Sequence, residues 1–160
     1  MDYLWAPWRI EYIKHAKDEG CILCDKPAAG DDAANLILYH GAHNFIILNA
    51  YPYNPGHLMV APDRHVATLD GLSDVERNEL FELVSRSVVI LRKVFCCDGF
   101  NIGLNLGKIA GAGVDKHIHT HIVPRWAGDT NFMPVIADTR VINEAVAETY
   151  ARLKPVFSAL

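Results

Sequence analysis

Three histidines at alternate positions constrain this chain more than any other feature of its sequence. They are His117, His119 and His121, separated by Ile118 and Thr120. Alternate side chains of a strand point to one face, so this spacing predicts a row of imidazoles about 6–7 Å apart. Because imidazole titrates near neutral pH and fills a strand face poorly, the row indicates a functional site rather than ordinary packing.

Two kinds of chemistry use such a row of imidazoles. One is metal binding, in which neutral imidazoles are the ligands. The other is nucleophilic catalysis, in which one imidazole attacks phosphorus while its neighbours orient it or contact the phosphate. The preceding segment carries Asn105, Gly107, Gly111 and Gly113. Glycine allows backbone amides to approach an anion closely, so this loop favours a phosphate site beside the histidines.

Length, charge and hydropathy narrow the class of protein. The chain has 160 residues, a common size for one domain, so we expect residues 1–160 to form a single domain. A net charge of −4 argues against a nucleic-acid binder, which needs clustered Lys and Arg. No apolar run is long enough to cross a membrane, and the first residues lack the apolar core of a signal peptide. We therefore expect a cytoplasmic protein.

Hydrophobic periodicity predicts mixed α and β structure, with short loops that favour antiparallel pairing of the strands. Ser73 and Glu76 match a capping box, and a helical apolar pattern follows them as far as Gly99. Residues 25–34 are expected to form a surface loop, and residues 140–154 a C-terminal helix with one apolar face. The expected strands cover residues 36–39, 45–49, 57–61, 100–104 and 116–123, the last of them stopped by Pro124.

The segment 117–123 resembles the signature of the histidine triad (HIT) nucleotide-binding family. In that signature three alternating histidines are separated by apolar residues, and two further apolar residues follow the last histidine. Thr120 departs from it, because it stands at one of the apolar positions. Asn49 and the sequence Pro55-Gly56-His57 also resemble the family's first half-site. The resemblance implies an α+β, HIT-like fold. This fold is an antiparallel sheet of about five strands flanked by helices, continuous across a homodimer.

The same resemblance implies a chemistry, which is nucleotidyl transfer through a covalent nucleotidyl-histidine. His119 would be the nucleophile that attacks the α-phosphorus. His121 would contact the phosphate and leaving-group side, and His57 would support that face. Asn49 would bind ribose, and Asn105 the phosphate or the bridge that is cleaved. A nitrogen nucleophile needs a polar partner on its other ring nitrogen, which in the family is a backbone carbonyl.

Two further stretches resemble one subgroup, the diadenosine tetraphosphate phosphorylases (ATP adenylyltransferases). They are residues 4–9 and 124–135. In this subgroup inorganic phosphate, rather than water, accepts the nucleotide from the histidine. Substrates would be purine mononucleotides or dinucleoside polyphosphates. Trp126, Asn131 and Phe132 would shape the nucleotide or phosphate pocket, with ordinary packing as the alternative. Many family members place Gln or Ser in the loop before the triad, where this chain has residues 111–113, Gly-Ala-Gly, and this argues against simple hydrolysis.

Cys21 and Cys24 have the spacing of metal ligands, of a redox pair or of a chance coincidence. A tetrahedral zinc needs two more ligands. Several HIT proteins and the related hexose-1-phosphate uridylyltransferases use a cysteine pair, a later histidine and the first triad histidine. In this chain those positions are Cys21, Cys24, His65 and His117. We therefore expect a structural zinc that ties the N-terminal segment, about residues 3–30, to the catalytic strand.

Three other functions use parts of the same set of residues. A hydrolase of dinucleoside polyphosphates or nucleoside phosphoramidates would keep His119 but use water as the acceptor. A purine-nucleotide-binding regulatory module would need no nucleophile, so the presence of His119 argues against it. A uridylyltransferase for sugar phosphates would share both the zinc and the nucleophile, but this chain is short for one.

Overall fold

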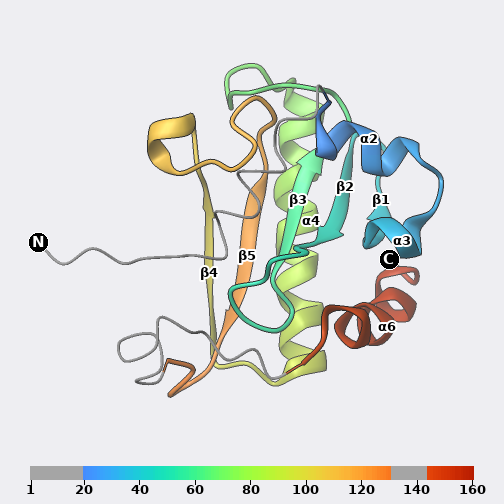
Figure 1. The fold of residues 1–160 in the computed structure, drawn as a ribbon, viewed down its shortest axis with the longest axis vertical. Coiled ribbons are helices and arrows are strands. Elements are labelled where there is room, and N and C mark those ends of the chain that lie inside the picture. The colour runs from blue at the N-terminus through green and yellow to red at the C-terminus, as the bar shows by residue number, and fades with distance from the viewer. Residues whose placement is uncertain (1–19, 131–143) are drawn as a thin grey trace, which may run out of the picture.

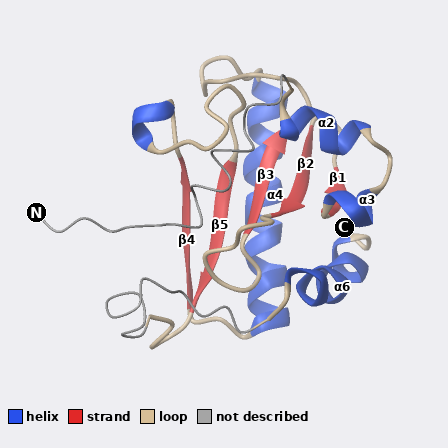
Figure 2. Cartoon of the chain, in the orientation of Figure 1, coloured by secondary structure: helices blue, strands red, loops and turns tan. Residues whose placement is uncertain are grey.

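The computed structural model describes residues 20–130 and 144–160. A five-stranded antiparallel sheet with the order β1-β2-β3-β5-β4 lies at its centre, and α4 runs along one face of it (Figure 1). The strands are β1 (Ile37–His40), β2 (Asn44–Leu48), β3 (Leu58–Pro62), β4 (Gly99–Leu104) and β5 (Thr120–Arg125). The helices are α2 (Ile22–Ala28), α3 (Asp32–Asn35), α4 (Asp74–Phe95), α6 (Val146–Phe157) and the short 3₁₀ turn η1 (Lys108–Ala110) (Figure 2). This architecture confirms the predicted α+β fold.

Helix α4 begins with the predicted capping box. The Ser73 hydroxyl accepts the Glu76 N–H, and the Glu76 carboxylate accepts the Ser73 N–H at 2.7 Å. The apolar face of α4 packs on the sheet and forms the larger core with α6, whose Leu153 and Phe157 are fully buried. The prediction that this helix extends to Gly99 is wrong, because it ends at Phe95 and Cys96 turns the backbone into the left-handed region (φ 50°).

The other face of the sheet is covered at β1 and β2 by α2. Leu23 of this helix packs against Ile37, Phe45, Ile47 and Ala61 in a second, smaller core. The expected surface loop over residues 25–34 is therefore wrong, since α2 and α3 occupy most of it. In the described part of the chain, no helix has the length and apolarity needed to span a membrane.

The triad enters the sheet later than its alternation predicts. Strand β5 begins at Thr120, so only His121 of the three histidines lies within it. Upstream of β5, the Ile118 N–H donates to the Val66 carbonyl at 2.7 Å instead of joining a strand ladder. Pro124 does not stop the strand. Its carbonyl accepts from the Asn54 side chain on the β3 side of the strand, where pairing with β3 reaches only Ile122, so its missing N–H costs no ladder bond there.

The C-terminal helix differs from its predicted range of 140–154. Residues 140–143 lie outside the described part of the chain, and α6 begins at Val146. At the other end it continues past Pro155 to Phe157, whose fully buried side chain docks the last turn on the core. Burial of this aromatic ring outweighs the backbone hydrogen bond that Pro155 cannot make.

The turn before β3 brings His57 to the site. Gly56 adopts φ +77°, and a Cβ at this position would lie 3.0 Å from the ring of Phe95. Glycine is required here for both reasons, the left-handed backbone and the close approach of α4. As a result His57, directly before β3, is fully buried, and its side chain contacts His121 of β5.

Candidate active site

His119 is held in one tautomer by the main chain. Its Nδ1 lies 2.8 Å from the carbonyl oxygen of His117, and a carbonyl can only accept, so Nδ1 carries the proton. The other ring nitrogen, Nε2, therefore keeps its lone pair. Burial lowers the pKa of His119, against the opposing effect of this hydrogen bond, and so favours the neutral ring. A neutral imidazole with a free lone pair on Nε2 is the form that attacks phosphorus.

A backbone amide fixes the tautomers of two further histidines, His57 and His121. The Tyr53 N–H donates to Nδ1 of His57 at 3.1 Å, so the proton of His57 lies on Nε2. That Nε2–H donates to Nδ1 of His121 at 3.0 Å, which leaves His121 with its own proton on Nε2. The rings of His121 and His119 meet edge to face, with their centroids 4.9 Å apart. The arrangement thus places the neutral ring of His119 beside a His121 ring whose proton lies on Nε2.

Asn49 lies beside this histidine pair at the end of β2. Its Oδ1 accepts the Tyr51 N–H at 2.9 Å, which fixes the orientation of the amide. The amide nitrogen therefore faces His57, 3.4 Å from Nε2. Because that Nε2 is already a donor, the contact is one of packing. Ribose binding by Asn49 stays a prediction.

A cavity of about 310 Å³ opens next to the histidines. His121 and Asn105 both line it, and their contact with phosphate stays a prediction. His119 is buried behind His121, with 6% of its surface exposed. The other lining residues of the cavity include Arg125 on β5 and residues 101–104 of β4.

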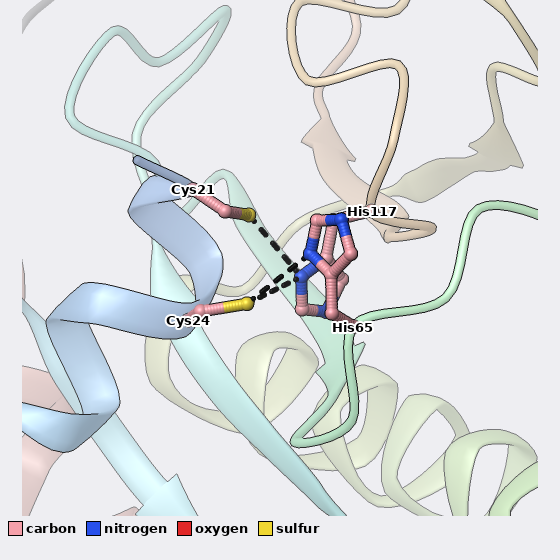
Figure 3. Close-up of side chains that lie close together, drawn as sticks. All are labelled: Cys21, Cys24, His65 and His117. Atoms are coloured by element: carbon pink, nitrogen blue, oxygen red, sulfur yellow. Dashed lines mark hydrogen bonds between the residues drawn. The ribbon is translucent and has the colours of Figure 1, made fainter. Parts of the chain in front are cut away.

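The four predicted metal ligands gather on the other side of the triad (Figure 3). Cys21 and Cys24 come from the start of α2, His65 from the loop after β3, and His117 from the segment before β5. Their ligand atoms all lie within 4.8 Å of one another. Nδ1 of His117 is 3.3 Å from Sγ of Cys21 and 3.4 Å from Sγ of Cys24. Sγ of Cys24 also lies 3.3 Å from Nδ1 of His65.

This cluster fits a tetrahedral metal ion. In a tetrahedral zinc site, bonds of about 2.3 Å to sulfur and 2.05 Å to nitrogen place S and N about 3.6 Å apart, close to these distances. Nε2–H of His117 donates to the Pro62 carbonyl at 2.8 Å, which directs the Nδ1 lone pair at the thiols. Burial, followed by the Cys21 thiol, raises the pKa of Cys24 to about 11. A bound cation would reverse this shift, because thiolate is the ligand form.

The loop that carries His65 is anchored to α4 by an ion pair. The Arg64 guanidinium donates to both carboxylate oxygens of Glu76, at 2.8 Å each, and also to the Gly71 carbonyl. This pairing and the Ser73 N–H lower the pKa of Glu76 to about 2. The N-terminal turn of α4 thus positions one side of the metal cluster.

Comparison with known proteins decides the family. The model of the HIT domain matches residues 31–128, which is more than half of the chain. The chain belongs to the HIT family. Its relatives include AP-4-A phosphorylase of Mycobacterium tuberculosis, 37% identical over 93% of this chain and 80% of the relative. The asymmetrical bis(5'-nucleosyl)-tetraphosphatase of Schizosaccharomyces pombe is 36% identical over 58% of this chain and 50% of that protein.

Among solved structures of the HIT fold, a Zn-bound histidine triad family protein from Mycobacterium smegmatis superposes with a TM-score of 0.70. It is 26% identical, and the match covers 88% of this chain and 94% of that chain. This likeness extends over nearly the whole neighbour. It agrees with the sheet order and helix placement described above.

Several predicted HIT site residues lie away from the cavity. Trp126 packs edge-on against Phe95, and its Nε1–H donates to the Phe95 carbonyl at 3.3 Å. These contacts correspond to ordinary packing, the alternative considered for this residue. Gly111 and Gly113 lie in the loop after η1 but are not among the lining residues. Asn131 and Phe132 lie outside the described residues.

Sequence reasoning missed the residues at the far end of the cavity. Arg125 forms a two-pronged ion pair with Asp129, and its guanidinium also donates to the Asn101 side chain. Asn54, buried in the turn before His57, joins the same network through Asp129. One signal was available, because Arg125 continues the alternation of His121 along the same strand face. The break expected at Pro124 concealed it.

Proposed function

We propose that this HIT protein transfers a nucleotidyl group by way of a covalent intermediate on His119. One observation carries the proposal: buried His119 donates Nδ1–H to the His117 carbonyl and so keeps the lone pair of Nε2 for attack. A dinucleoside polyphosphate is the proposed donor. The M. tuberculosis and S. pombe relatives, whose names state activity on such molecules, support this choice.

In the first step Nε2 of His119 attacks the α-phosphorus of the donor. An N–P bond forms while the bridging P–O bond breaks, and the remaining nucleoside polyphosphate leaves with the bridging oxygen. The ring then carries a positive charge. The hydrogen bond from Nδ1 to the His117 carbonyl stabilises this charge without moving a proton. The chemistry therefore needs no separate base for the first step.

In this scheme His121 donates a hydrogen bond to the leaving group. Its Nε2–H is a donor because His57 fixes the other nitrogen as an acceptor. We assign it to the bridging oxygen on which negative charge develops. His57 acts through His121 and is a positioning residue, held by the Tyr53 N–H and fully buried.

Inorganic phosphate is the proposed acceptor in the second step. A phosphate oxygen attacks the same phosphorus, the N–P bond breaks, and a nucleoside diphosphate leaves. For diadenosine tetraphosphate the products are ATP from the first step and ADP from the second. The 37% identity to AP-4-A phosphorylase over 93% of the chain supports phosphate. The S. pombe relative supports water as the alternative acceptor.

A structural zinc on Cys21, Cys24, His65 and His117 completes the proposal. The ion would supply four coordinate bonds that hold α2 and the His65 loop to the segment carrying the triad. Because His117 contributes both a ring to this cluster and a carbonyl to His119, the cluster would fix the position of that carbonyl. No chemical step involves the metal.

We further propose that two copies join through β4 into one continuous sheet. β4 is the last strand in the sheet order, and Asn101, Ile102 and Gly103 are exposed on it. An edge strand with an exposed isoleucine favours pairing with another strand. Light scattering of the purified protein would give the mass of two chains, and Ile102→Lys would lower it to one. A monomeric wild-type protein would contradict this part of the proposal.

Trapping the intermediate tests the proposed chemistry. The protein is mixed with diadenosine tetraphosphate in phosphate-free buffer, quenched within seconds and analysed by intact-mass and peptide mass spectrometry. One added AMP on the peptide containing His119 is the expected result. AMP on another residue, or products formed with no labelled protein at any quench time, would exclude His119 as the nucleophile.

A further inference from the structure

The cavity beside the triad has a directional lining. The strand register places His121 and Asn105 at the end of this lining near the proposed chemistry, and Asn101 and Arg125 further along β4 and β5. His121 and Arg125 lie four residues apart on the same face of β5, so the two ends are about 13 Å apart. A group that leaves past His121 would therefore have an extended space in front of it.

The lining of this cavity favours anionic ligands. Although the chain carries a net charge of −4, none of the described residues that line the cavity is Asp or Glu. The polar groups there include the donors of His121, Arg125 and the amides of Asn101 and Asn105. Donors along the cavity, where the one carboxylate bonded to the lining, Asp129, is already paired with Arg125, suit a chain of phosphate oxygens.

Arg125 is held rigidly at the far end. Nε and one terminal nitrogen of its guanidinium bind the two carboxylate oxygens of Asp129, and the other terminal nitrogen binds Oδ1 of Asn101. The Asp129 carboxylate also accepts from the Asn54 side chain and from the Trp126 N–H, so both of its oxygens are engaged in this network. Three of the five guanidinium N–H groups are thereby used, and the other two bond to none of the described residues, on a side chain that is 38% exposed.

Gly103 keeps the middle of the cavity open. It pairs with His121 across the sheet and lies between Asn101 and Asn105 on the same strand face. A Cβ added at Gly103 would meet no atom within 4 Å, and its φ lies outside the left-handed region. The backbone therefore does not require glycine here, while a side chain at this position would enter the space above the strand.

From these features we propose that the cavity binds the polyphosphate chain of the departing nucleotide, with Arg125 contacting its far end as a chain-length selector. The inference rests on the proposed function, because it assigns a site to that reaction's leaving group. Each added phosphoryl unit moves the end of the chain further from His121. A tetraphosphate donor thus gains contacts with Arg125 that a shorter donor makes less well.

The test compares three donors on the wild-type protein and on two variants, Arg125→Gln and Gly103→Val. The donors are diadenosine tetraphosphate, diadenosine triphosphate and adenosine 5′-phosphoramidate, which has no polyphosphate leaving group. We expect Arg125→Gln to lower kcat/KM for the tetraphosphate about tenfold or more and to change the phosphoramidate value less than about twofold. Gly103→Val should impair both dinucleotides by obstructing the cavity. Arg86→Gln, which breaks an exposed ion pair with Glu82 on α4, is the matched control.

Equal losses for all three donors would overturn the inference, because they would show that Arg125 acts only through the Asp129 network. An unchanged tetraphosphate value in Arg125→Gln would overturn it as well. If the wild-type protein uses none of the donors, the proposed function fails, and calorimetric binding of inorganic triphosphate then tests the cavity separately. Binding that weakens about tenfold in Arg125→Gln but not in Arg86→Gln supports the site, and equal affinity refutes it.

Discussion

His117 contacts the metal cluster through its imidazole and His119 through its backbone carbonyl. Its imidazole faces the thiols of Cys21 and Cys24, while its backbone carbonyl lies 2.8 Å from Nδ1 of His119. The metal cluster and the proposed nucleophile thus share one residue. A hydrogen bond from His117 Nε2 to Pro62 fixes this ring from the opposite side. The position of the carbonyl that orients His119 therefore depends on the contacts of the cluster.

Replacing His119 tests its role as the nucleophile. His119→Ala should lower nucleotidyl transfer more than about 1,000-fold, because the proposed covalent intermediate forms on Nε2 of His119. Nucleotide affinity should change little, since binding does not need the lone pair of Nε2. Steady-state turnover and equilibrium binding check both statements. His43→Ala, at an exposed histidine, is the control, and wild-type turnover in His119→Ala would contradict the account.

The metal cluster predicts a stoichiometry. Protein purified without chelator should contain close to one zinc per chain by elemental analysis, and Cys24→Ser should lose it. Removing a ligand should also lower Tm, because binding free energy contributes to folding. Cys96→Ser, at an exposed cysteine outside the cluster, should keep both values. A wild-type content below about 0.2 metal per chain would count against the site.

The Arg64–Glu76 pair predicts acid sensitivity of folding. The pKa of Glu76 falls from 4.5 to about 2, chiefly through Arg64 and then the Ser73 amide. A folded-state pKa below the unfolded one stabilises the fold above the unfolded value, and this contribution is lost as pH falls through the folded value. Glu76→Gln should therefore lower Tm most at pH 7, and the difference should shrink between pH 4.5 and pH 2. A difference in Tm that is independent of pH would refute this role.

Substitutions at Gly30 and Gly56 allow the cost of a left-handed backbone to be measured apart from the cost of a steric contact. Gly30 and Gly56 both have a positive φ, but a Cβ on Gly30 meets nothing, whereas one on Gly56 meets Phe95 at 3.0 Å. Gly30→Ala should cost about 1–2 kcal/mol of unfolding free energy. Gly56→Ala should cost roughly 1 kcal/mol or more beyond that, because Phe95 must move. Urea denaturation measures both, and equal costs would show that the contact with Phe95 is relieved without penalty.

The strands and the capped helix α4 were predictable because their signals are local. Alternating apolar residues mark β4, and Ser73 with Glu76 marks the start of α4. The end of α4 was not, because Cys96 adopts a left-handed conformation that its residue type does not favour. Contacts far apart in the sequence also decided the start of β5, where Ile118 bonds to Val66 rather than to a strand.

At the site, residue type and spacing identified the triad and the cysteine pair, but the cavity depends on tertiary pairing. Gly103 lies across from His121 only because β4 and β5 are neighbours in this register. Arg125 lines the cavity only because β5 continues through Pro124. The pairing of β4 with β5 does not follow from local sequence, and the alternation that marks Arg125 was hidden by the break expected at Pro124.

The most direct test of the central claim is product analysis of diadenosine tetraphosphate with and without inorganic phosphate. Transfer from His119 to phosphate predicts ADP and ATP, formed only when phosphate is present, with label from radioactive phosphate in the β-position of ADP. AMP and ATP formed equally well without phosphate would contradict phosphate as the acceptor and make the protein a hydrolase.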